Sequence, residues 1–189
     1  KDMGPAQWQL LARTISEEAN KEDVSGVVVT HGTDTLEEAA LFLHLTLSTD
    51  KPIVLTGSMR PATALSPDGP ANLFHAVQVC ASANASGRGV MVVMNGEILP
   101  ALHVVKRHSI ATNAFTSSPA RPLGRVYSGR TLFFSDSTKA ALAGAFGGAL
   151  SNDVALPAVD IHYVAAGNSH ADLLSRDWTE RSGLVIAGF

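Results

Sequence analysis

The chain has 189 residues, of which 46% are hydrophobic and 16% are charged, and this composition excludes a disordered protein because it supplies enough apolar material for a core. There are 14 Lys and Arg against 17 Asp and Glu, a net charge of −3, and no run of basic residues, so we expect no nucleic-acid partner. At about 150 residues per domain the length corresponds to roughly 1.3 domains, which allows one large domain or one domain and part of another.

No apolar run approaches the roughly 18 residues that a membrane-spanning helix needs, so we expect no membrane partner. The single cysteine, Cys80, excludes an internal disulfide framework and lies in an apolar stretch, which favours a buried structural thiol. Residues 1–5 have neither an initiator Met at position 1 nor a signal-peptide pattern, and we interpret them as an internal part of a longer protein. The compartment stays open, with the cytoplasm favoured over the periplasm or secretion.

Strand and helix patterns alternate through the first half of the chain. The expected elements are a helix over 5–20, a strand over 26–30, a helix over 39–47, a strand over 52–56, a helix over 70–82 and a strand over 90–94. The strands are apolar throughout, which is typical of strands buried on both faces. Thr35 and Glu38 have the spacing of a capping box before the second helix. This alternation predicts an α/β fold with a mostly parallel sheet flanked by helices.

The pattern weakens after Val126, where the sequence becomes rich in Gly, Ala and Ser. Strand, helix and strand patterns return at 159–164, 171–180 and 183–188. We therefore predict a partial α/β domain over 1–128, a linker over 129–156 and the beginning of a smaller α/β domain over 157–189.

Ligands of parallel sheets bind beyond the carboxyl ends of the strands, which directs attention to the loop after the first strand. That loop runs from His31 to Thr35 and contains hydroxyls, an imidazole and a carboxylate. A hydroxyl needs a base to become a nucleophile, and Lys106 is a candidate for that base. The alternatives are that Asp34 and Thr35 only cap the next helix and that Lys106 is a solvated surface residue.

Seven His residues raise the question of a metal site. No His pair has the His-Glu-x-x-His arrangement, and His103 and His108 are five residues apart beside Lys106 and Arg107. We therefore expect no metal site. Asp68, which precedes Gly69 and Pro70, is interpreted as a helix start rather than as a catalytic carboxylate.

Several longer stretches resemble the bacterial-type L-asparaginase family. They are VTHGTDTLEE at 29–38, KPIVLTGSMRP at 51–61, SPDGPANL at 66–73, and GVMVVMN at 89–95 followed by the Val-Lys pair at 105–106. The resemblance runs in order from Asp2 to Phe189 and is strongest from Gly26 to Leu123.

The resemblance implies hydrolysis of the side-chain amide of L-asparagine, or more slowly of L-glutamine, to the acid and ammonia without a metal or organic cofactor. In this family a Thr attacks the amide and water then hydrolyses the ester. Thr33, Asp34 and Lys106 match the family's hydrogen-bonded triad, with Lys106 as proton acceptor and Thr33 positioning or activating the attacking group. The resemblance also implies that Asp34 holds the substrate's α-amino group, and that the backbone carbonyl of Ser58 accepts a hydrogen bond from the leaving amide. Lys1 matches a substrate-binding position often held by Gln or Ser.

The resemblance further implies a homotetramer, a dimer of dimers with sites at the dimer interface. The family's Thr-Gly-Gly-Thr motif, which carries the usual primary nucleophile, does not occur in these residues, and neither does the lid with its Tyr. We therefore expect the 189 residues alone to lack asparaginase activity. Two alternatives stay open: an asparaginase-like subunit of a tRNA-dependent amidotransferase, or a non-catalytic interaction module. A nucleotide-binding domain is disfavoured because neither the dinucleotide Gly fingerprint nor a Walker loop occurs.

Overall fold

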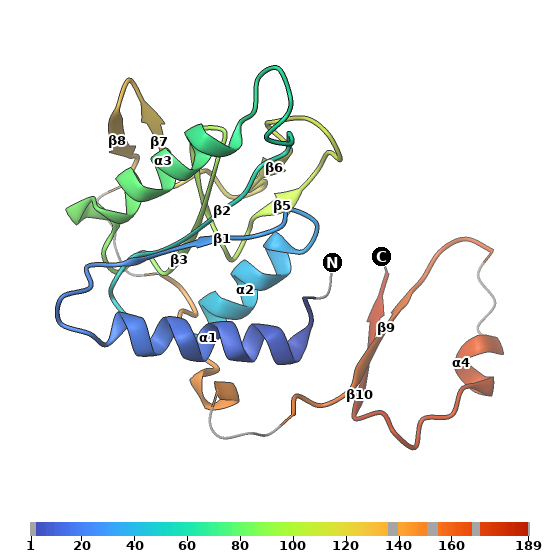
Figure 1. Ribbon diagram of the computed structural model, residues 1–189. Coiled ribbons are helices and arrows are strands. Elements are labelled where there is room, and N and C mark those ends of the chain that lie inside the picture. The colour runs from blue at the N-terminus through green and yellow to red at the C-terminus, as the bar shows by residue number, and fades with distance from the viewer. Residues whose placement is uncertain (1–2, 136–139, 151–154, 168–170, 189) are drawn as a thin grey trace. The chain divides into compact units, whose positions relative to one another are not determined.

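The computed structural model (Figure 1) describes residues 3–135, 140–150, 155–167 and 171–188. The chain divides into two compact units, Lys1–Ser151 and Asn152–Phe189, and each is described by itself. None of the helices in the described ranges is both long and apolar enough to cross a membrane.

A six-stranded sheet with the order β1-β2-β3-β4-β7-β8 forms the centre of the first unit. Its strands are β1 (Val27–Thr30), β2 (Ile53–Thr56), β3 (Val90–Met94), β4 (Glu97–Pro100), β7 (Gly124–Tyr127) and β8 (Arg130–Phe133). The first three strands are parallel, as the alternation predicts. The other three extend the sheet in antiparallel fashion, because β4 and β8 each return through a short turn rather than through a helix.

Helices cover both faces of this sheet, with α1 and α2 on one face and α3 on the other (Figure 1). The helices are α1 (Pro5–Ala19), α2 (Leu36–Thr46) and α3 (Gly69–Cys80), with short 3₁₀ turns at Ala83–Ala85 and Gly147–Leu150. Successive side chains of a strand point to opposite faces, so Ile53 and Leu55 pack in the core with α1 and α2, whereas Val54 packs with α3. The predicted α/β fold with a sheet flanked by helices is confirmed.

β1 differs from the expectation of a strand buried on both faces. β2 and β3 are buried along their whole length, but Val27 to Val29 are only half-buried and Thr30 is exposed. The cause is position: β1 lies at an edge of the sheet and pairs with β2 alone among the described strands. An apolar run predicts a strand but does not show where in the sheet that strand lies.

The start of α2 also departs from the prediction. Thr35 occupies the N-cap position, but its side chain makes no capping hydrogen bond, so the predicted capping box is wrong. Glu37 and Glu38 instead place two carboxylates in the first turn, where the helix dipole favours negative charge.

β8 lies inside segment 129–156, which we expected to be a linker. Its hairpin with β7 turns at Ser128 and Gly129, whose φ angles of 48° and 72° suit a two-residue turn. Farther along, the backbone N–H of Phe146 donates to the carbonyl of Leu45 at the end of α2 (2.8 Å). Described parts of this segment therefore belong to the first unit.

A separate antiparallel pair, β5 (Val105–Lys106) and β6 (Phe115–Thr116), places Lys106 opposite Phe115. Phe115 is buried in the core that α1 and α2 share, and Val104 just before β5 is buried there too. The core therefore fixes the backbone from which the Lys106 side chain extends.

The second unit has the predicted order of strand, helix and strand. Its elements are β9 (Val159–Tyr163), α4 (Ala171–Ser175) and β10 (Gly183–Ala187), and the two strands are parallel. Asp160 on β9 accepts hydrogen bonds from Arg176 (2.7 Å) and Arg181 (3.2 Å). Arg176 and Arg181 lie in the segment between the two strands, so these ion pairs hold that segment against β9.

Candidate active site

The loops after β1 and β2 meet at the carboxyl edge of the parallel strands. A Cβ atom at Gly57 would lie 2.5 Å from the carbonyl oxygen of His31 and 3.2 Å from the Thr33 methyl group, so only glycine allows the two loops to approach this closely. A hollow of about 390 Å³ opens between them. It is lined by Thr30, His31, Gly32, Thr56, Gly57, Ser58, Gly69 and Leu73. This is the position at which α/β proteins bind ligands.

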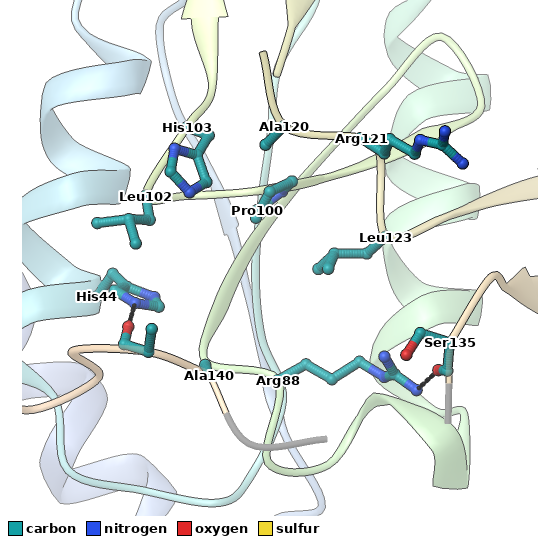
Figure 2. Close-up of a pocket in the computed structure, with 11 residues that line it drawn as sticks. His44, Arg88, Pro100, Leu102, His103, Ala120, Arg121, Leu123, Ser135 and Ala140 are labelled. Atoms are coloured by element: carbon teal, nitrogen blue, oxygen red, sulfur yellow. Dashed lines mark hydrogen bonds between the residues drawn. The ribbon is translucent and has the colours of Figure 1, made fainter. Parts of the chain in front are cut away.

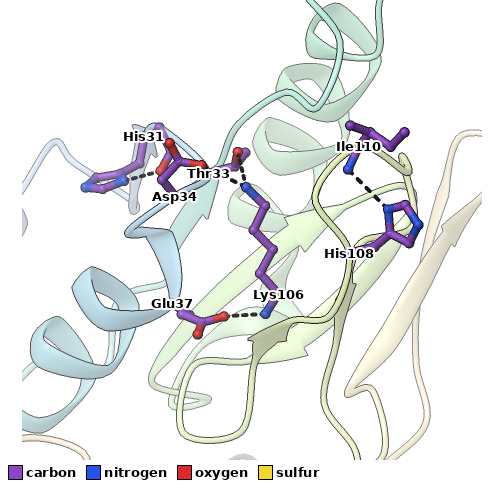
Figure 3. A network of polar contacts seen from close by, with 8 residues as sticks. His31, Thr33, Asp34, Glu37, Lys106, His108 and Ile110 are labelled. Carbon is purple, nitrogen blue, oxygen red and sulfur yellow. Dashed lines mark hydrogen bonds and ion pairs between the residues drawn. The ribbon is translucent and has the colours of Figure 1, made fainter. Parts of the chain in front are cut away.

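Lys106 joins the predicted Thr and Asp residues across more than seventy positions of sequence (Figure 3). Its Nζ donates to Thr33 Oγ1 at 3.1 Å and to Asp34 Oδ1 at 3.0 Å. The Lys106 side chain is 16% exposed, whereas that of Asp34 is 85% exposed. The amine is therefore held beneath the loop, and the carboxylate faces solvent.

The backbone of Lys106 is held as well. Its N–H donates to Oε2 of Glu37, which extends from the first turn of α2 (Figure 3). With Phe115 paired to it across the β5–β6 ladder, the lysine is fixed at its base before its side chain reaches the loop.

Ser58 lies in the loop after β2, is exposed, and lines the hollow. Lys1, the other predicted substrate-binding residue, lies outside the described residues. The structure thus brings Thr33, Asp34 and Lys106 into hydrogen-bond contact, and it places Ser58 directly after the glycine that packs against Thr33.

Three polar residues near the site, Glu37, Asp68 and Asn72, are not assigned to it from the sequence. Glu37 enters only as part of the motif at 29–38, and Asp68 is predicted only to start a helix. Asn72 is buried and hydrogen-bonded to the loop after β2. The spacing Asp-x-x-x-Asn at 68–72, one helical turn apart, is the signal that could have found the last two, since it places both side chains on one face of α3.

Within the described ranges, no group of three or more His, Cys, Asp or Glu side chains is placed to hold a metal ion. His108 has a structural role, because its Nδ1 accepts hydrogen bonds from the backbone N–H groups of Ile110 and Ala111, both at 3.1 Å (Figure 3).

A second hollow, of about 290 Å³, is lined by His44 and Arg88 among others (Figure 2). Because His44 is hydrogen-bonded to Val90, the first residue of β3, this hollow lies at the amino end of that strand. His44 Nδ1 accepts the N–H of Val90 (3.3 Å), so Nε2 carries the proton and donates to the carbonyl of Ala141 (2.8 Å). Arg88 donates to the carbonyl of Ser135 (2.7 Å). These two basic side chains fasten neighbouring segments around the hollow.

The chain matches several known proteins. The family model described as "Asparaginase, N-terminal" matches residues 1–139. The glutaminase-asparaginase of Pseudomonas fluorescens biotype A is 52% identical over 124 residues, which cover 66% of this chain and 34% of that protein. The probable L-asparaginase 1 of Schizosaccharomyces pombe is 42% identical over 189 residues, which cover 100% of this chain and 52% of that protein. The crystal structure of the probable cytoplasmic L-asparaginase from Campylobacter jejuni has a TM-score of 0.89 and 40% identity, covering 99% of this chain and 61% of that one.

The fold and the site define an α/β protein with a Thr, an Asp and a Lys gathered at the carboxyl edge of its sheet. With the family match over residues 1–139 and the S. pombe relative at 42% identity over the whole chain, the chain belongs to the asparaginase family. The family resemblance of its motifs is thereby confirmed. The chain spans about half the length of the S. pombe relative and about a third of that from P. fluorescens.

Proposed function

We propose that the protein hydrolyses the side-chain amide of L-asparagine to L-aspartate and ammonia. The observation that carries this proposal is the position of Lys106 Nζ, within hydrogen-bond reach of both Thr33 Oγ1 and Asp34 Oδ1 beside the loop of Ser58. A hydroxyl next to an amine that can take up its proton is the arrangement that nucleophilic acyl transfer needs.

In the proposed reaction Thr33 positions or activates the attacking group, and Lys106 in its neutral amine form accepts the proton which that group loses. The oxygen of the attacking Thr hydroxyl bonds to the amide carbon. Lys106 then passes the proton to the amide nitrogen, the C–N bond breaks, ammonia leaves, and the acyl group is held as an ester of the attacking hydroxyl. Water then hydrolyses the ester and releases aspartate. Proton transfer by a positioned side chain is worth about 10²- to 10⁴-fold in rate.

The proposed substrate contacts follow from charge and hydrogen bonding. The exposed carboxylate of Asp34 suits the substrate's α-ammonium group, since an ion-paired hydrogen bond is among the stronger polar contacts. The backbone carbonyl of Ser58 is proposed to accept an N–H from the amide that leaves. Lys1 is proposed to contact the substrate as well.

L-Glutamine is proposed as a second, slower substrate, and the name of the P. fluorescens relative supports including it. We also propose a dimer of dimers with sites at the dimer interface. The proposed division is a partial α/β domain over 1–128, to whose sheet β8 adds the edge strand, a connecting segment over 129–156 and the beginning of a smaller domain over 157–189. No observation favours the amidotransferase subunit or the interaction module.

The test uses the protein expressed from its complete reading frame, with ammonia release measured from asparagine and glutamine. Thr33→Val and Lys106→Met are expected to lower kcat/KM by about 100-fold or more, because each removes one partner of the proton transfer. Thr14→Val and Lys21→Met, at exposed positions on and just after α1, are the matched controls and are expected to leave the rate unchanged. Unchanged rates in both site variants would refute the proposed roles.

A further inference from the structure

The first turn of α3 holds the loop around Ser58 from both sides. Asp68 Oδ2 accepts the backbone N–H of Met59 at 3.0 Å, and Oδ1 accepts that of Arg60 at 2.9 Å. Asn72, one turn farther along, donates its side-chain amide to the carbonyl of Gly57 at 3.0 Å. The residues directly before and after Ser58 are therefore both fastened to the same helix.

The bond to Met59 fixes the direction of the Ser58 carbonyl. The C=O of Ser58 and the N–H of Met59 belong to one planar trans peptide group, so they point in opposite directions. When Asp68 holds that N–H toward α3, the Ser58 oxygen must point away from the helix. An anionic acceptor on the N–H also polarises the same peptide group, which makes its carbonyl oxygen a better acceptor.

Asp68 is held in its ionised form. Partial burial alone would raise the pKa of the Asp68 carboxyl, but hydrogen bonds from the backbone N–H groups of Met59, Arg60 and Asp68 itself, and from the Asn72 amide, together hold it below its ordinary value. A charged acceptor of this kind forms stronger hydrogen bonds than a neutral one.

Asn72 anchors the arrangement in the core. It is 2% exposed, its Nδ2 also reaches Asp68 Oδ2 (3.1 Å), and its Oδ1 accepts the backbone N–H of Asn95 (3.0 Å), which follows β3. One buried amide thus connects the loops after β2 and β3 to α3. Because Gly57 packs against Thr33, a shift of this loop also changes the distance between the Ser58 carbonyl and the Thr33 hydroxyl.

We infer that Asp68 and Asn72 are positioning residues for the amide hydrolysis, acting by aiming the Ser58 carbonyl at an N–H of the substrate's side-chain amide. The inference rests on the proposed function. Neither residue touches the reacting atoms, and their effect depends on the substrate having an amide N–H to offer.

The experiment therefore compares a substrate that has this N–H with one that lacks it. kcat/KM is measured on the protein from the complete reading frame with L-asparagine and with the β-methyl ester of L-aspartate, which has the same α-groups but no N–H for the Ser58 carbonyl. Asp68→Asn removes the charge and leaves one oxygen for two backbone donors. Its kcat/KM for asparagine is expected to fall about 10- to 100-fold, as for a small misplacement of a reacting group, and that for the ester less than about 3-fold.

Asn72→Ser, which removes the donor to Gly57, is expected to show the same selective loss, and Asp23→Asn at an exposed turn is the control for an Asp-to-Asn exchange. Retained ester hydrolysis reports that the variants are folded. An equal loss on both substrates in Asp68→Asn and Asn72→Ser overturns the inference. The asparaginase function still stands in that case if the wild-type protein hydrolyses asparagine and Thr33→Val lowers its kcat/KM by about 100-fold or more. If the wild-type protein hydrolyses neither substrate, the proposed function fails and the inference fails with it.

Discussion

At the scale of single residues, Asp34 contacts the lysine and is also proposed to contact the substrate. Its Oδ1 accepts a hydrogen bond from Lys106 Nζ, and its side chain is 85% exposed on the side where the α-ammonium of a substrate is proposed to bind. Asp34→Asn keeps an oxygen for Lys106 but removes the charge. A hydrogen bond to a charged group is worth about 1.5 to 3 kcal/mol, so kcat/KM for asparagine should fall roughly 10- to 150-fold. Succinamic acid, which lacks the α-amino group, should lose much less. Equal losses on both compounds would show that Asp34 acts through Lys106 instead.

Asp68 makes a residue-scale prediction about stability. Its folded-state pKa lies below the unfolded value of about 3.9, so its carboxylate stabilises the fold fully above about pH 5 and loses that effect progressively as the pH falls through the unfolded and then the folded-state pKa. Urea unfolding should therefore find wild type more stable than Asp68→Asn by about 1 to 3 kcal/mol at pH 7. The difference should shrink below pH 4. A difference that is the same at pH 7 and at pH 3 would contradict the proposed hydrogen bonding of the charged form.

At the scale of elements, the site depends on a contact between α2 and β5. Glu37 accepts the backbone N–H of Lys106, so it sets the position of the strand from which the lysine extends. Glu37→Ala should lower kcat by about 10-fold, and Glu37→Gln, which keeps an acceptor oxygen, should stay near wild type. Glu38→Ala, an exposed neighbour in the same turn, controls for the loss of negative charge at the helix start. Steady-state kinetics would decide: equal effects of Ala and Gln at position 37 contradict the positioning role.

The elements also show what the sequence can and cannot predict. The parallel strands and their helices follow from apolar periodicity, which predicts them to within a few residues. The antiparallel half was missed although Asn95-Gly96 and Ser128-Gly129, both pairs with positive φ, are two-residue hairpin signals. Motif order marks Thr33, Asp34 and Lys106, and the structure brings them into hydrogen-bond contact; their roles in the reaction stay a prediction. The hydrogen bonds of Glu37, Asp68 and Asn72 join backbone groups that only the folded chain brings together.

At the scale of the whole molecule, the second unit presents an apolar surface of its own. The parallel register places Val159, Ile161, Tyr163 and Val185 on one face of the β9–β10 pair, and Ile161 in its middle is 56% exposed. Parallel strands are normally covered on both faces, and a contiguous exposed apolar patch promotes association.

We therefore expect the 189-residue chain to bind the dye ANS and to self-associate as its concentration rises. Ile161→Lys should reduce both effects, because a charge in the centre of this face makes its burial against another molecule costly. Ile110→Lys places the same charge at an isolated exposed isoleucine in a loop and should change neither. Light scattering and ANS fluorescence over a concentration series measure the outcome. If the two variants behave alike, the β9–β10 face is not what drives association, and the exposed edge of β1 becomes the surface to test next.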